Sequence, residues 1–332
     1  MNSFGRLFRV QVMGESHGEG VGVLIDGCPA GMPLSTDDFM VDIDRRRGGT
    51  QQGTTPRKEA DLPRIVTGLF QEKTTGAPLT ILFDNENTRS ADYEKQRAIP
   101  RPGHADFVAN RKFGGFEDYR GSGHFSGRLT LCLVAAGVVA KKILSTITIH
   151  ADLVEVGGLT SVEAGIQRAI DLKDSVGGII ECRVVGLPIG LGEPFFDSAE
   201  SLLAHLAFSV PAVKGIEFGS GFAAARMTGS EHNDPLMKES GVTSSNHAGG
   251  IVGGLTNGNP LVFRLAIKPT SSTPKEQTSL NWETGQAENF SIKGRHDLCI
   301  ALRVPVVAES IAAMAVADLM MLEQRIPRLF SH

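Results

Sequence analysis

The chain has 332 residues and a formal net charge of −4 at pH 7, and 41% of its residues are hydrophobic but only 6% aromatic. This length and apolar fraction are enough to bury a sizeable core, and the slightly negative charge excludes a protein whose whole surface attracts nucleic acid. None of the 4 cysteines forms a C-x-x-C pair, so we expect neither a metal site nor a redox motif. We see no secretory signal and therefore expect a reduced, cytoplasmic protein.

The first predicted element is a strand that ends in polar residues. Phe8, Val10 and Val12 alternate along one face, which is typical of a half-buried strand. The strand runs into the sequence MGESHGEG at residues 13–20, where an acid, a hydroxyl and an imidazole stand between glycines. From the residues alone this stretch is either a polar turn or the tip of a catalytic site.

A strand–turn–helix pattern occurs twice along the chain. A β-branched run followed by G-x-P-x-G spans residues 23–34 and again 182–194. A helix-start signal follows each time, at Ser35-Thr36 and at Asp197-Ser198. The repeat indicates two related halves, although chance is an alternative because Gly and Pro are common turn residues.

The remaining elements favour an α+β fold. Helices are predicted at 126–146, 160–172 and 307–325, and β-branched strand segments at 64–69, 78–83, 146–157, 179–186, 213–219 and 261–267. Strands in runs with few helices between them are typical of antiparallel sheets rather than of a doubly wound parallel sheet. The longest apolar run, 129–140, is too short to span a bilayer. No composition shift divides the chain, so we predict one domain over residues 1–332.

Three adjacent arginines predict an anion site. Successive residues point in different directions around a helix, so at least one of Arg45, Arg46 and Arg47 must face inward. A buried unpaired guanidinium is costly, and an anionic ligand offsets that cost because arginine binds carboxylate and phosphate bidentately. A solvated helix C-terminus, where cations suit the helix dipole, is the alternative.

Several further glycine turns carry the same kinds of side chain. Arginine, histidine, serine and threonine stand among glycines in RPGHADF (101–107), DYRGSGHFSGR (118–128), TSSNHAGGIVGGLTNG (243–258), KPTSS (268–272) and KGRHD (293–297). This inventory indicates a polyanionic small molecule together with a phosphate-bearing cofactor. The scarcity of aromatic residues argues against nucleic-acid binding by base stacking. GSGFAA at 219–224 looks like a dinucleotide-binding fingerprint, but the residues after it have poor helix periodicity, which argues against a Rossmann site.

In this order, the motifs resemble one family. GESHG, DRRR-G-T, RPGHAD, DYRG-G, VKG-E-G-GF, SNHAGGI-GG-T-G-P, KPTSS and GRHD are similar to the motifs of chorismate synthases, and the resemblance extends from Phe4 to about Ala317. It implies a β-α-β sandwich of two antiparallel sheets around helices, assembled as a homotetramer. It also implies a lyase that converts 5-enolpyruvylshikimate 3-phosphate to chorismate and phosphate by 1,4-anti elimination, with reduced FMN as cofactor.

The resemblance also implies roles for individual residues. His17 and His104 would be the acid–base pair, with His17 near the leaving phosphate and His104 near the flavin. Ser16 and Asp297 would form a relay that assists proton removal at the flavin, and Arg46, Arg128 and Arg295 would hold the substrate anions. Contacts with FMN would come from His124, Phe125, Ser126, Pro211, Ala212, Gly253, Lys268, Pro269, Thr270, Ser271, Ser272 and Arg295.

Three departures from the family pattern stand out. Gln52 replaces a second arginine after the triple-arginine turn, Phe125 and Gly127 replace the usual Ser and Ala, and Pro211 replaces an asparagine. None of them affects the two histidines. The chain carries no additional domain for reducing its own flavin, so NADPH is expected to act only indirectly, through an external flavin reductase.

Two other functions use part of the same inventory. A catalytically silent sensor of a phosphometabolite or flavin would need the arginines, but it would not need Ser16, His17 and Asp297 together. A single-stranded nucleic-acid binder would show strongly salt-dependent affinity. The small-molecule enzyme, bound to neither nucleic acid nor membrane, is the reading that uses all of these residues.

Overall fold

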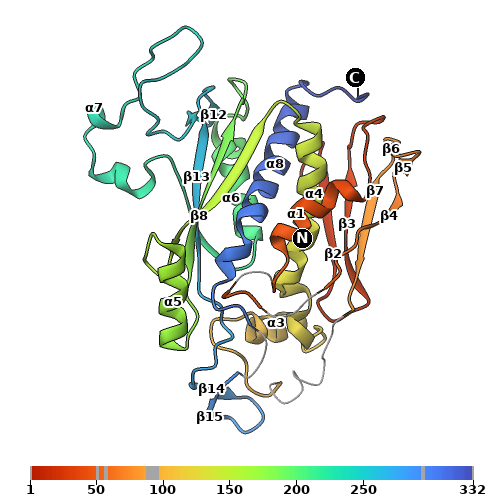
Figure 1. Ribbon diagram of the computed structural model, residues 1–332, viewed down its shortest axis with the longest axis vertical. Coiled ribbons are helices and arrows are strands. Elements are labelled where there is room, and N and C mark those ends of the chain that lie inside the picture. Colours follow the sequence, from red (N-terminus) through yellow and green to blue (C-terminus); the bar gives the residue numbers. More distant parts are fainter. Residues whose placement is uncertain (1, 50–51, 56–58, 87–96, 293–295, 331–332) are drawn as a thin grey trace.

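Two antiparallel sheets form the outer layers of the computed structural model, which describes residues 2–49, 52–55, 59–86, 97–292 and 296–330 (Figure 1). In spatial order, the first sheet consists of β1 (Ser3–Phe4), β2 (Arg9–Gly14), β3 (Gly20–Asp26), β7 (Leu79–Asp84) and β4 (Arg64–Thr67). The second consists of β10 (Val213–Phe218), β13 (Leu261–Ile267), β9 (Gly178–Val185) and β8 (Thr148–Val156).

A layer of helices separates the two sheets. It contains α1 (Asp37–Arg46), α4 (Thr130–Ile143), α6 (Ala199–Ser209) and α8 (Pro305–Leu322). The first sheet packs against α4 and the second against α8, and these two helices pack on each other (Figure 1). Both helices are apolar on nearly all sides because each faces a sheet and other helices. The arrangement is the α+β sandwich that the sequence predicted.

The two halves of the chain repeat one topology. When β1, α5 and the shorter elements are set aside, each half consists of two strands, a helix, two more strands and a long central helix. The strand order is the same in both sheets, β2-β3-β7-β4 in the first and β8-β9-β13-β10 in the second. This correspondence supports the internal duplication that the repeated strand–turn–helix pattern suggested.

Shorter elements complete the described part of the fold. These are the strands β5 (Leu69–Phe70), β6 (Lys73–Thr74), β11 (Ile251–Val252), β12 (Leu255–Thr256), β14 (Gln277–Asn281) and β15 (Gln286–Phe290), the helices α3 (Asp106–Phe113), α5 (Val162–Leu172) and α7 (Gly229–His232), and the 3-10 turns η1 (Arg120–Phe125), η2 (Gly127–Leu129), η3 (Phe195–Asp197), η4 (Gly221–Arg226) and η5 (Ile300–Arg303). The β14–β15 hairpin and α3 were not predicted, because both sequences lack a clear apolar period. GSGFAA enters the 3-10 turn η4, and the preceding β10 is antiparallel to its neighbour, which is not the βαβ context of a Rossmann site.

The buried apolar side chains form one cluster that draws on both halves of the chain. We infer from this shared core that the chain is one domain. Two segments, 120–143 and 305–322, are apolar and long enough to cross a membrane, but 72% and 83% of their most apolar windows are buried inside the protein. They therefore have the character of core helices. All 4 cysteines are free and buried.

Gly137 sets the distance between the two central helices. A Cβ atom at this position would lie 2.3 Å from Cβ of Ser310 and 2.6 Å from its Cα, so a side chain on α4 would press into α8. The crossing therefore depends on the absence of a side chain at Gly137.

Replacing Gly137 with alanine is expected to lower the free energy of unfolding by about 1–3 kcal/mol, the usual cost of overpacking a core. Urea unfolding followed by circular dichroism measures the change. Gly229→Ala is the matched control, because a Cβ there would meet nothing within 4 Å. Equal unfolding midpoints for Gly137→Ala and the wild type would contradict the close packing.

Candidate active site

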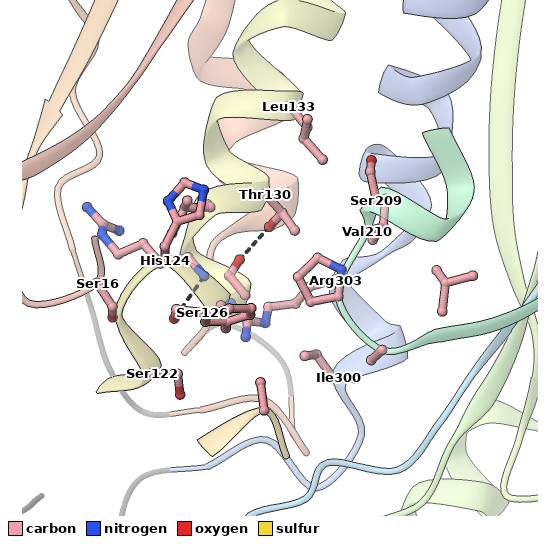
Figure 2. Close-up of a pocket in the computed structure, with 18 of the residues that line it drawn as sticks. Ser16, Ser122, His124, Ser126, Thr130, Leu133, Ser209, Val210, Ile300 and Arg303 are labelled. Atoms are coloured by element: carbon pink, nitrogen blue, oxygen red, sulfur yellow. Dashed lines mark hydrogen bonds between the residues drawn. The ribbon is translucent and has the colours of Figure 1, made fainter. Parts of the chain in front are cut away.

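A cavity of about 770 Å³ lies where α4 and α8 begin and where α1 and α6 end (Figure 2). Because the two halves share a topology, the cavity receives equivalent helix ends from each of them. Arg46 and Ser209 come from the ends of α1 and α6, and Thr130 and Arg303 lie at or just before the starts of α4 and α8. Segments far apart in the sequence thus meet at one place.

Most of the predicted site residues line this cavity. They are Ser16, Arg46, His104, His124, Phe125, Ser126, Arg128, Pro211, Ala212, Lys268, Pro269, Thr270, Ser271, Ser272 and Asp297. Apolar side chains of Leu133, Val210 and Ile300 share the lining with them (Figure 2).

Two buried arginines converge on one buried carboxylate. Arg128 Nη1 donates to Asp61 Oδ1 at 2.8 Å, and Arg46 Nη1 lies 3.7 Å from Asp61 Oδ2. Arg46 also donates to Thr130 Oγ1 at 2.9 Å and to the carbonyl oxygen of Gly127 at 3.0 Å. Burial, together with the charges of Arg303 and Arg128, lowers the pKa of Arg46. The cluster therefore carries excess positive charge that an anion would stabilise.

The three adjacent arginines do point in three directions. Arg45 does not line the cavity and donates two hydrogen bonds, of 2.6 and 2.7 Å, to the carboxylate of Glu309. Arg46 is buried, and Arg47 lines the cavity while donating to the carbonyl oxygen of Ala60 at 2.6 Å. The inward-facing arginine predicted from the sequence is thus Arg46.

His17 lies behind the wall of the cavity. Ser16 lines the cavity, whereas buried His17 is not among the described residues that do. The His17 ring lies against Gly121, where a Cβ atom would stand 2.0 Å from Nδ1. Gly121 itself lines the cavity and has a φ of 56°. The backbone of Gly121 therefore separates the His17 imidazole from the cavity.

His104 is held by a carboxylate. Its Nδ1 lies 2.7 Å from Asp106 Oδ1, and Arg101 binds both oxygens of Asp106 at 2.7 Å. Hydrogen bonds from Arg101 and His104 keep the pKa of Asp106 well below its usual range, despite burial. On the other side of the ring, Nε2 lies 3.2 Å from Ser122 Oγ. These contacts fix the orientation of the imidazole.

The carboxylate of Asp297, from the C-terminal part of the chain, is held by two hydrogen bonds. Its Oδ1 accepts from the backbone N–H of Thr55 at 2.9 Å, and its Oδ2 accepts from Arg303 at 2.6 Å. Asp297 and Ser16 share the cavity, but within the part of the chain that the structure describes they form no hydrogen bond with each other.

Some polar atoms in the lining have no hydrogen-bond partner among the described residues. These buried atoms without a described partner are Thr270 Oγ1, His296 Nε2 and Arg303 Nε. Burial and the charge of Arg101 lower the pKa of His296, so its ring is neutral at pH 7. Buried polar groups are normally satisfied by protein, water or ligand, and the three residues that carry these atoms line the cavity.

Two predicted contacts are not found in the cavity. Gly253 lies on the β11–β12 turn, next to Gly254, whose carbonyl oxygen accepts from the backbone N–H of Ala199 at the start of α6. The cavity lies at the other end of α6, about 16 Å away for an 11-residue helix. Gly253 therefore lies about one helix length from the described lining of the cavity, and its contact with FMN stays a prediction. Arg295 lies outside the described residues.

Sequence reasoning missed several residues of the site. Asp61, Arg101, Asp106, Ser122 and Arg303 all contact or accompany the predicted side chains. Asp106 and Ser122 stood within motifs that had been noted, so their spacing from His104 and Ser126 was an available signal. Asp61 closes the arginine-bearing stretch 44–61, but no role was assigned to it. Arg303 belongs to no such motif, and only the folded chain brings it to the cavity.

Comparisons with known proteins identify the family. The model of the chorismate synthase family matches residues 8–321. A chorismate synthase of Chitinophaga pinensis is 69% identical over 333 residues, covering 100% of both chains, and one of Dehalococcoides mccartyi is 43% identical over 359 residues, covering 99% of each. A crystal structure of a chorismate synthase matches 96% of this chain and 93% of its own, with a TM-score of 0.73 and 25% identity. The chain belongs to the chorismate synthase family, the lyases that form chorismate on the way to the aromatic amino acids.

Proposed function

We propose that the protein converts 5-enolpyruvylshikimate 3-phosphate to chorismate and phosphate by 1,4-anti elimination, and that it requires reduced FMN. The observation that carries this proposal is the pair of buried arginines at the cavity, Arg46 and Arg128, which share one carboxylate, that of Asp61. A substrate with two carboxylates and a phosphate supplies the anions that this pair lacks.

The residues present fit a flavin phosphate. The cavity of about 770 Å³ lies within the usual range for small-molecule sites, about 300–1,000 Å³. Lys268, with the hydroxyls of residues 270–272, offers polar groups to a phosphate, and Thr270 Oγ1 has no described partner of its own. Leu133, Val210 and Ile300 offer apolar surface to a flat ring. When bound, reduced FMN would supply an electron transiently, with no net redox change.

The proposed roles of the side chains follow from their positions. Arg46 and Arg128 hold substrate anions. Arg295 lies outside the described residues, so its share of this role stays a prediction from the family motif. His104 moves a proton at the flavin edge of the site, and an imidazole suits this because its ordinary pKa lies near neutrality. His17 donates a proton near the leaving phosphate from behind Gly121.

The predicted relay of Ser16 and Asp297 requires a bridge. Both residues line the cavity, but Asp297 is occupied by Thr55 and Arg303. Substrate, flavin or water between the two side chains would complete the relay.

The proposed FMN contacts are the predicted ones that line the cavity, namely His124, Phe125, Ser126, Pro211, Ala212, Lys268, Pro269, Thr270, Ser271 and Ser272. The homotetramer, the cytoplasmic location and the supply of reduced flavin by an external NADPH-dependent reductase are further proposals from the resemblance.

An anaerobic turnover assay tests the function. The protein is given chemically reduced FMN and 5-enolpyruvylshikimate 3-phosphate, and chorismate absorbance and inorganic phosphate are measured together. Equal amounts of both products are expected, with none when FMN stays oxidised. Folded, flavin-bound protein that releases neither product would overturn the proposal and would favour the silent sensor.

A further inference from the structure

We propose that Ser122 is a positioning residue that relays a proton between the cavity and His104, completing a chain from Asp106 through His104 to Ser122. The proposal rests on the acid–base role given to His104 under the proposed function. It concerns a hydroxyl within the glycine turn at 118–128 to which the sequence motifs assign no role.

The geometry assigns the proton positions on the His104 ring. Asp106 is ionised, because hydrogen bonds from Arg101 and His104 lower its pKa. An ionised carboxylate can only accept, so the 2.7 Å contact with Asp106 Oδ1 places a proton on Nδ1. Arg101 Nη2 also lies 3.1 Å from Nδ1, but it can only donate and Nδ1 already carries a proton, so the two do not bond. Arg101 Nη2 donates to Asp106 Oδ1. In the neutral form of the imidazole, Nε2 then carries no proton and can accept a hydrogen bond.

Ser122 supplies the proton that Nε2 accepts. Arg101 Nη2 donates to Ser122 Oγ at 2.8 Å, which occupies one lone pair of the hydroxyl. Ser122 Oγ lies 3.2 Å from Nε2, so its own proton points to the His104 ring. Ser122 also lines the cavity (Figure 2). The hydroxyl thus stands between the imidazole and the space where a ligand binds.

The backbone at Ser122 lies in the left-handed region, between two glycines that share it. Gly121, Ser122 and Gly123 have φ angles of 56°, 74° and 52°. Glycine adopts such angles freely, whereas a residue with a Cβ atom does so at a cost. Both neighbours are glycine, and a third glycine would remove the strain. Serine at this position therefore sacrifices stability while providing a hydroxyl.

The proton transfer balances without any other reagent. When a group in the cavity releases a proton, Ser122 Oγ accepts it as the hydroxyl proton of Ser122 passes to His104 Nε2. Only O–H and N–H bonds break and form. The resulting imidazolium is stabilised by Asp106, and the reverse transfer returns the proton to the cavity.

Ser122→Gly tests the relay, because it removes the hydroxyl and the strain together. We expect kcat to fall about tenfold with KM changed less than about twofold, since the hydroxyl holds no substrate anion. Lys173→Gly is the matched control: Lys173 has a φ of 48° at the exposed end of α5, so relief of the same kind of backbone strain there should leave kcat unchanged.

Nitrogen NMR of the ligand-free protein gives a readout that does not depend on turnover. The His104 resonances are identified by their loss in His104→Gln. Wild type should show the Nδ1–H tautomer, and Ser122→Gly should shift the Nε2 resonance toward that of an unbonded acceptor without changing the tautomer. An unchanged Nε2 resonance, or kcat within twofold of wild type in Ser122→Gly, would overturn the relay. A wild type without turnover would overturn the proposed function, while the NMR result would still decide whether the hydrogen-bonded chain exists.

Discussion

Replacing His17 with alanine is expected to lower kcat by about 100-fold or more, the scale on which enzymes lose activity when an acid–base group is removed. The imidazole is buried behind Gly121, at the end of the hairpin formed by β2 and β3. Its place in the wall, rather than in the open cavity, suits a proton donor that is shielded from bulk water. The anaerobic assay with reduced FMN measures the change in kcat.

His150→Ala is the matched control for this experiment. His150 lies on β8 with 65% of its side chain exposed, so its loss should leave kcat unchanged. Gly121→Ala provides a second route to the same result, because the added methyl group would collide with the His17 ring. Near wild-type rates in both His17→Ala and Gly121→Ala would remove His17 from the mechanism.

Replacing Asp61 with asparagine is expected to lower the free energy of unfolding by about 3–5 kcal/mol, the usual cost of breaking a buried ion pair. Asp61 is 4% exposed and is the carboxylate shared by Arg46 and Arg128. Its φ of 49° is left-handed, which asparagine also tolerates, so the substitution changes the charge with little backbone strain. Urea unfolding in a buffer without multivalent anions measures the loss.

Inorganic phosphate should restore part of this stability. A phosphate bound between the two arginines replaces the missing charge, and at 100 times its dissociation constant it would contribute about 2.7 kcal/mol. Asp152→Asn is the control, because 67% of the Asp152 side chain is exposed and its pairing with His150 contributes little. If Asp61→Asn unfolds at the wild-type midpoint, or if phosphate stabilises Asp152→Asn as much as Asp61→Asn, the anion site is misplaced.

The sequence predicted those helices and strands that are buried along their whole length, because burial leaves a clear apolar pattern in the residues. The continuous apolar runs of α4 and α8 and the β-branched runs of β8, β9 and β13 follow from how deeply these elements are buried, and these runs can be read along the chain. The repeated strand–turn–helix unit likewise indicated two halves. The polar β14–β15 hairpin could not be predicted in this way, because neither of its strands buries a continuous apolar face.

The site was predicted in composition but not in its internal connections. The glycine turns with Arg, His and Ser indicated an anion pocket, and the family motifs named most of the residues that now share one cavity. The partners that orient these residues were not predicted. Arg303 holds Asp297, and Asp61 joins Arg46 of its own stretch to Arg128 across the fold; no spacing in the sequence indicates these pairings.

What the sequence determined by itself, then, is the set of elements, the family and the chemical character of the pocket, because side-chain period and residue type act locally. The tertiary structure alone decided which groups touch. It placed His17 behind Gly121 rather than in the open cavity, carried Gly253 to the far end of α6, and brought Ser122 to His104. Such contacts depend on how two sheets and four helices pack together, and packing distances between segments far apart in the chain leave no periodic signal in the sequence.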